Sequence, residues 1–208
     1  MDISRRVYPL DPRELTEEQL AVTFAMTSRN PQSFDEIAKL VTTEKAADFH
    51  ERWVLNYGHA SVADHAILHM AIENVSRLAC DTLEDNRLAS YTEKSSRYQV
   101  LGQGHYHIPR ELDGLSLKDV YVNTCNSLFT TYQETIERLL EYLQNVTPKN
   151  DGERDSAYNL RLRRIATDVC RFLLPAATLT NVGMTLNARS MEHAIRKLLS
   201  SKSLEEQE

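Results

Sequence analysis

A long amphipathic helix is the feature that most constrains how this chain can fold. Apolar residues recur at helical spacing from Val120 through Ile136 to Leu143, and Ser116 is placed to cap the start. The pair Thr147-Pro148 stops the helix, because proline cannot continue the backbone hydrogen-bond ladder. After a polar linker over 149–155, a second helical pattern begins and stops at Pro175.

Shorter elements are expected on both sides of these helices. A capping-box pattern, Ser or Thr followed three residues later by Glu or Gln, begins two of them. The expected elements are helices from Thr16 and from Ser33, a helix over 44–57, a buried strand over 66–78, a strand or buried extended piece over 176–186 and a last helix over 187–199. The stretch His105–Pro109 and the glutamate-rich end are expected to be exposed, the latter as a solvated tail.

Composition indicates the broad class of protein. With 208 residues, 41% of them hydrophobic, the chain can form one globular domain over residues 1–208. A net charge of -6 argues against a general nucleic-acid binder, and no apolar run is long enough for a membrane span. The three cysteines form no CxxC pair, so we expect neither a disulfide framework nor a zinc cluster, and a reducing cytoplasm is the simplest location.

The segment from Arg87 to Tyr98 has the most unusual composition. It holds two arginines ten positions apart, one carboxylate, many hydroxyls and a single large aliphatic residue, Leu88. Arginine forks and hydroxyls suit a phosphorylated, planar ligand. If the segment is extended, Glu93 and Arg97 point to the same side. On composition alone, a solvated and charge-paired loop is the favoured interpretation.

Two further places are suited to an anion. Arg171 lies in an apolar run, so it needs a partner or a ligand, unless it reaches solvent at a helix edge. Asn187 and Arg189 open the last expected helix, where a phosphate is favoured. A plain asparagine cap with an exposed arginine explains the same residues.

A metal site is not expected. His65 and His69 are four positions apart, which suits a metal only on a helix, and no further ligands have metal-like spacing. The alternative is a turn capped by His59, with His65 satisfied in the core. No glycine-rich phosphate loop is present either, so a nucleotide would have to bind in another way.

Four motifs in register resemble those of the flavin-dependent thymidylate synthases, over roughly residues 16–200. They are Gly58-His59-x-Ser61-Val62-x-Asp64-His65, Arg87-x-x-Ser90-x-Thr92-Glu93-x-Ser95-x-Arg97-Tyr98, Arg171-x-x-Leu174-Pro175 and Asn187-x-Arg189-Ser190-Met191-x-His193. The resemblance implies an α/β (α+β) fold, with a helix-rich single domain around a central β-sheet. It also implies a homotetramer with active sites at subunit contacts. Such enzymes make dTMP from dUMP, with methylenetetrahydrofolate as carbon donor and NADPH as hydride source through FAD.

The resemblance also implies roles for individual residues. Substrate contacts to dUMP fall on Glu93, Lys94, Ser95, Ser96 and Arg97, with Arg171 holding the phosphate from another subunit. Contacts to the flavin cofactor fall on His59, Ser61, Arg87, Glu93, Asn187, Arg189 and His193. No catalytic residue and no metal ligand is assigned.

The sequence departs from the family pattern at four positions. Asp85 and Asn86 stand where the family signature has Arg and His, before the retained Arg87. Thr82 stands at the position of a glutamine that reads the pyrimidine, and Leu198 at that of an arginine that helps to ionise it. Two hypotheses follow: an enzyme in which other groups replace the lost ones, and a non-catalytic or regulatory member, which includes one half of a duplicated protein. A third, weaker interpretation is a module that binds dUMP without FAD.

Overall fold

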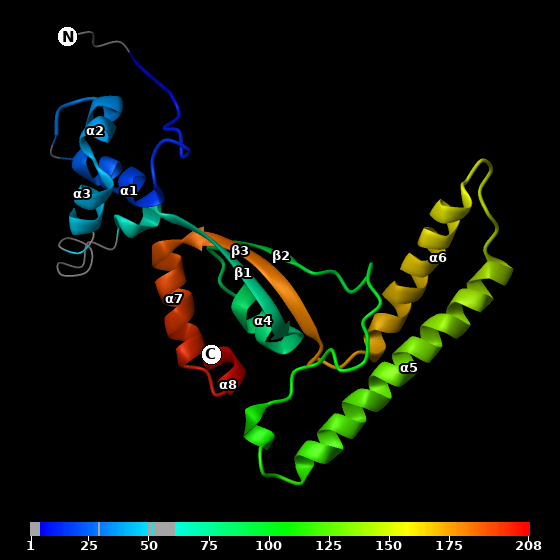
Figure 1. Cartoon of the computed structure of the whole chain (residues 1–208). Helices are drawn as coiled ribbons and strands as arrows, with labels where there is room; N and C mark the ends of the chain where they lie inside the picture. The colour runs from blue at the N-terminus through cyan, green and yellow to red at the C-terminus, as the bar shows by residue number, and fades with distance from the viewer. Residues whose placement is uncertain (1–4, 29, 50, 52–60) are drawn as a thin grey trace. The chain divides into compact units, whose positions relative to one another are not determined.

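The computed structural model describes residues 5–28, 30–49, 51 and 61–208 (Figure 1). The chain divides into two compact units. Unit 1 comprises Met1–Met70, Asn86–Ser90 and Met184–Lys197, and unit 2 comprises Ala71–Asp85, Tyr91–Gly183 and Leu198–Glu208. The expectation of one domain over 1–208 stays a prediction.

A three-stranded sheet has the order β1-β3-β2, with β1 (Ile67–Ser76), β2 (Ala89–Glu93) and β3 (Leu179–Asn187). Bonds from Arg77 N to Thr178 O and from Ala188 N to Ala66 O show that β1 and β3 are antiparallel. Every second residue of β3 is buried, from Thr180 to Leu186. The expected strand over 176–186 is therefore confirmed, and it is the central strand.

The buried strand expected over 66–78 is a strand, but it is not buried. β1 is an edge strand, and Met70 is 44% exposed within it. Asn74 interrupts its alternation with a φ of 58°, a left-handed conformation that asparagine tolerates. The Asn74 N–H donates to Asn181 Oδ1 (3.1 Å). This local geometry explains why the sequence shows no clean period of two here.

The helices of unit 1 follow their caps. Thr16 and Gln19 form the reciprocal bonds of a capping box at the start of α1 (Glu17–Met26). A second box at Ser33 begins α2 (Phe34–Leu40), and α3 (Thr43–Phe49) packs with both around Val22, Ile37, Val41 and Ala46. Residues 52–57, the last part of the helix expected over 44–57, lie outside the described residues. The last predicted helix is confirmed as α7 (Ala188–Leu199).

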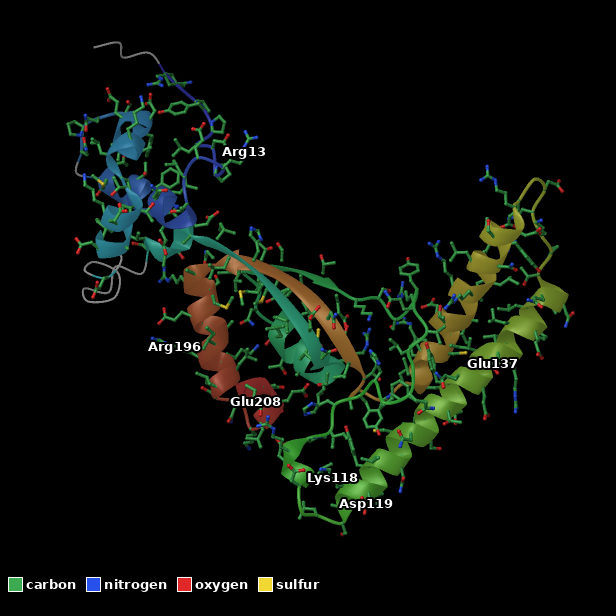
Figure 2. The ribbon with its side chains drawn as sticks, in the orientation of Figure 1. Arg13, Lys118, Asp119, Glu137, Arg196 and Glu208 are labelled. Atoms are coloured by element: carbon green, nitrogen blue, oxygen red, sulfur yellow. The ribbon has the colours of Figure 1, made fainter. Side chains whose placement is uncertain are left out.

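Unit 2 is built on the long helix that the sequence predicted. α5 (Leu117–Val146) runs beside α6 (Asp155–Cys170), with Lys118 and Asp119 in its first turn (Figures 1 and 2). Phe129, Tyr132 and Leu162 are almost fully buried in the core between them. A short 3-10 helix, η4 (Arg171–Leu173), follows α6 before Pro175. Among the described residues, no helix is long and apolar enough to cross a membrane.

The helix that follows β1 was not predicted from the sequence. α4 (Arg77–Glu84) begins directly after β1, and Ser76 caps it by accepting a bond from Ala79 N (3.1 Å). Ala79 stands where a capping box has Glu or Gln, so the cap signal in the sequence is incomplete. With only eight residues, the helix is also too short for a clear apolar repeat.

The expectation of a solvated glutamate tail is wrong. Residues Leu204–Gln207 form α8, and the Glu205 carboxylate accepts bonds from Ser76 N and from Ser76 Oγ, both 2.7 Å. Glu206 accepts a bond from Thr82 Oγ1 (2.9 Å). The Glu205 carboxylate therefore meets backbone and hydroxyl donors at the start of α4, where the helix dipole favours negative charge.

The expectation of an exposed stretch over His105–Pro109 is wrong in its centre. Tyr106 is only 8% exposed and forms an antiparallel bridge with Thr178. Its hydroxyl donates to Asn126 Oδ1 (2.9 Å), and its ring meets that of Phe129. Neighbouring His107 lies 3.6 Å from the Glu205 carboxylate. Tertiary pairing has therefore buried part of a stretch that is polar in sequence.

We predict that Glu205→Ala lowers the free energy of unfolding by about 2 kcal/mol, because it leaves two donors at Ser76 without their charged acceptor. Urea unfolding followed by circular dichroism measures this. The matched control is Glu208→Ala, which removes an exposed ion pair with Arg110 and is expected to change stability by less than about 0.5 kcal/mol. Equal losses for the two variants would contradict the anchoring role of Glu205.

Candidate functional site

The residues after β2 are held in place from two sides. Lys94 N donates to Asn181 O of β3 (2.8 Å). Arg77 lies 3.1 Å from Glu93 through Nη1, and its Nη2 donates to Lys94 O (3.2 Å). Arg77 was not singled out in the sequence, because the helix that it begins was not recognised. Its position directly after a strand is the only signal that could have indicated it.

A second anchor lies at Arg97. The buried Thr167 hydroxyl of α6 donates a hydrogen bond to the Arg97 carbonyl oxygen. Ser95 Oγ accepts a bond from Arg97 N (3.3 Å), and Ser96 is buried. The segment from Glu93 to Arg97 is thus tied to β3 at one end and to α6 at the other. Its backbone is fixed, so its polar side chains are presented in a defined order.

Asp168 brings two of the expected substrate residues together. Arg97 Nε lies 3.2 Å from Asp168 Oδ1, and Arg171 Nε lies 2.9 Å from the same oxygen. The guanidinium of Arg171 also lies 4.8 Å from the centre of the Phe172 ring. Arg171 therefore has the partner that its apolar surroundings require. Two guanidinium groups that are 74 positions apart in sequence meet at one carboxylate.

The expected flavin contacts that belong to unit 1 come from several elements, with Arg189 and His193 one turn apart on α7. Ser61 and His193 are exposed, as is Arg87 in the turn before β2. Asn187 Oδ1 accepts a bond from Ser190 N (2.8 Å), so the asparagine cap is present. Arg189 pairs with Asp64 (3.0 Å). His59 lies outside the described residues.

The two expected groups of site residues fall in different units. All six expected substrate residues belong to unit 2. The described residues expected to contact only the flavin belong to unit 1, whereas Glu93, expected in both groups, belongs to unit 2. Unit 2 thus holds the expected dUMP contacts, including both arginines at Asp168.

The four positions that depart from the family pattern lie on or beside α4 and α7. Asp85 is the exposed C-cap residue of α4, and Asn86 next to it is buried. Thr82 donates to Glu206 of the C-terminal helix, so its hydroxyl is engaged. Leu198 lies in the last turn of α7.

One cluster has metal-ligand chemistry. The ligand atoms of Cys80, Glu84 and Glu93 all lie within 4.8 Å of one another. Burial and the nearby carboxylates of Glu93 and Glu84 raise the pKa of the Cys80 thiol to about 12, so it stays protonated at neutral pH. Metal binding would have to remove this proton. His65 instead lies against the Phe24 ring, and His69 Nδ1 is 2.9 Å from Thr185 Oγ1.

Comparison with solved structures first defines the class of fold. The flavin dependent thymidylate synthase ThyX from Helicobacter pylori, complexed with FAD and dUMP, superposes with a TM-score of 0.57. The sequences are 18% identical, and the match covers 92% of this chain and 84% of that one. The chain thus shares a helix-rich α/β fold with that enzyme.

The sequence comparisons then give the family. A family profile described as "Thymidylate synthase complementing protein" matches residues 13–208, so the chain belongs to this family, that of the flavin-dependent thymidylate synthases. A flavin-dependent thymidylate synthase of Clostridium tetani is 28% identical over 179 residues, covering 86% of this chain and 68% of the relative. A UPF0159 protein of Chlamydia muridarum is 40% identical over 168 residues, covering 78% of this chain. The chain spans about a third (32%) of that relative's length.

The raised thiol pKa values lead to a pH prediction. Burial raises the pKa of all three cysteines, most strongly that of Cys80, to about 12 from 9.0. The thiols of the folded state therefore keep their protons to a higher pH than those of the unfolded state. The contribution of the protonated thiol to stability is fully present below about pH 9 and is lost as pH rises towards 12. We expect a Cys80→Ala variant to lose stability less steeply over this range in urea unfolding. An unchanged slope would contradict the buried, protonated thiol.

Proposed function

We propose that this chain binds dUMP and methylates it to dTMP with methylenetetrahydrofolate, FAD and NADPH, as the family resemblance implies. The observation that carries the proposal is the ordered segment that ends in Ser95-Ser96-Arg97, which β3 holds at Lys94 and α6 holds at Arg97. Guanidinium groups and hydroxyls are the groups that bind phosphate monoesters best.

For the substrate, the segment Glu93–Arg97 would contact dUMP. Its backbone is anchored to β3 through Lys94 and to α6 through Arg97. The Glu93 carboxylate, paired with Arg77, accepts bonds from N–H or hydroxyl groups of a ligand. Arg97 would hold the phosphate, together with Arg171 of another subunit. A site whose backbone is already ordered binds with a smaller entropic cost.

For the cofactor, the donor set fits an anionic nucleotide in part. Arg87 is exposed, and the pair of Arg189 with Asp64 is exposed and therefore weak, so each guanidinium is open to an anionic ligand. Ser61, Asn187 and His193 add a hydroxyl, an amide and an imidazole. The carboxylate of Asp85, by contrast, adds negative charge beside Asn86. FAD, when bound, supplies the hydride-transfer chemistry, and these residues bind and orient it.

We also propose a homotetramer and a cytoplasmic location. Large apolar side chains next to the expected phosphate site are exposed in the single chain, Val169 and Phe172 among them. Exposed apolar surface of this kind favours assembly. The three cysteines are free and buried, which fits a reducing compartment.

A second candidate function is a non-catalytic or regulatory member of the family. It is favoured by the charge reversal at Asp85 and by the loss of the family arginine at Leu198. The length of the Chlamydia muridarum relative, of which this chain covers 32%, fits a chain that acts as one part of a larger protein. In this case the fold and nucleotide binding are kept, and catalysis belongs to a partner.

Purified protein distinguishes the two candidates. If the chain is an enzyme, we expect the protein to be yellow with bound flavin and to release tritium from 5-labelled dUMP when the folate and NADPH are added. Activity without any added partner would exclude the regulatory role. A colourless protein that binds neither FAD nor dUMP would exclude the enzyme.

We predict that Arg97→Ala weakens dUMP binding by about tenfold or more and leaves FAD binding nearly unchanged, because it removes charge-assisted bonds to the phosphate. Calorimetric titration with each ligand separately measures both. Arg138→Ala, an exposed arginine on α5, is the matched control and should change neither. A similar loss for both ligands, or no loss, would refute the assignment of Arg97 to the nucleotide.

A further inference from the structure

Cys80, Glu84 and Glu93 bring three potential metal ligands together within unit 2. Their ligand atoms, one sulfur and two carboxylate oxygens, all lie within 4.8 Å of one another. Cys80 and Glu84 are four residues apart on α4, so they share one face of the helix, whereas Glu93 is the last residue of β2. The cluster therefore depends on the approach of α4 to the end of β2, which sequence spacing does not show.

The thiol of Cys80 is directed into this cluster. Cys80 is 3% exposed, and its Sγ atom lies 3.5 Å from Glu84 Oε1. In the part of the chain that the structure describes, the thiol has no polar contact outside the cluster. A tetrahedral zinc ion holds sulfur at about 2.3 Å and oxygen at about 2.0 Å, which places two such atoms about 3.5 Å apart. The thiol and the Glu84 carboxylate already have the spacing of two zinc ligands.

The cluster carries more negative charge than its surroundings neutralise. Arg77 Nη1 lies 3.1 Å from Glu93 Oε1, and Glu84 has no ion pair among the described residues. Because a carboxylate has two oxygens, Glu93 can keep its contact with Arg77 while its other oxygen binds a metal. Carboxylates that bind metals usually have such an outer hydrogen-bond partner. A divalent cation would supply the missing positive charge.

The mixture of donors selects the class of ion. Calcium and magnesium are bound by oxygen atoms alone, whereas zinc accepts sulfur and carboxylate oxygen together. Three protein ligands leave the fourth position of a tetrahedral ion to water. The Cys80 thiol is protonated at neutral pH, so its S–H bond breaks as the zinc–sulfur bond forms, and the proton is released to solvent.

We propose that Cys80, Glu84 and Glu93 form a zinc site between α4 and the end of β2, with Arg77 holding Glu93 from outside the site. The bound ion joins α4 to the first residue of the segment Glu93–Arg97 and thereby fixes where this segment begins. Zinc binding here goes beyond the proposed function, because it requires neither dUMP nor FAD.

Metal titration of the full chain, after treatment with a chelator, tests this site. Calorimetry with zinc chloride should show one ion for each chain, and cobalt(II) in its place should give the near-ultraviolet charge-transfer absorption of a cobalt–thiolate bond. Cys80→Ser should abolish this absorption and weaken zinc binding by about a hundredfold. Glu84→Gln keeps the shape of a half-buried side chain and should weaken zinc binding by about tenfold or more.

Two control variants separate this site from other cysteines and glutamates. Cys170→Ser changes another buried, free cysteine, and Glu137→Gln an exposed carboxylate on α5 (Figure 2), so both should leave zinc binding unchanged. Circular dichroism checks that each variant is folded. The site is overturned if the wild type binds no zinc, if Cys80→Ser and Glu84→Gln bind it as tightly as the wild type, or if cobalt binds without thiolate absorption. Zinc is titrated without nucleotide, so its failure to bind leaves the proposed function standing, and failure of dUMP to bind leaves this site standing.

Discussion

The pairing of β3 with an earlier strand on each side is the constraint on which the rest of the structure depends. β3 (Leu179–Asn187) lies between β1 and β2, which are more than 80 residues earlier in the chain. The hydrogen bonding continues just past the ends of β1 and β2. Arg77 N donates to Thr178 O, and Lys94 N donates to Asn181 O. The start of α4 and the segment after Glu93 therefore take their positions from β3. Closing such long loops costs entropy, which explains why side-chain bonds from Arg77 and Thr167 reinforce the same segment.

Local periodicity predicted the parts of the fold that depend on local structure. The capping boxes at Thr16 and Ser33 and the long stripe that ends at Thr147 all appear in the structure. Features decided by distant contacts were missed. The acidic end reads as solvated, and only the donors at Ser76 show why Glu205 is ordered. β1 was expected to be buried because a strand's sequence does not reveal that it lies at a sheet edge.

The candidate site divides in the same way. Motif spacing identified Arg97 and Arg171, but their partner Asp168 is a common type of residue on an exposed helix face, and no local signal marks it. Arg77 was missed for a related reason, since its role comes from its contacts with the Glu93 carboxylate and the Lys94 carbonyl oxygen, which are distant in sequence. Recognition of charged ligands can survive when catalytic groups are lost, because it needs only an excess of cations. The retained arginines at Asp168 and the reversed charge at Asp85 are therefore compatible in one chain.

Phosphate binding and assembly would be coupled at this place through Phe172. Its ring is 80% exposed and lies 4.8 Å from the guanidinium of Arg171, which contacts Asp168. A second copy that covered Phe172 would also remove water from Arg171. In a drier environment each guanidinium interacts more strongly with an anion, and an unpaired one costs more. A phosphate that pairs with Arg171 would then favour the assembled state, and assembly would tighten phosphate binding by the same factor, because such coupling is reciprocal.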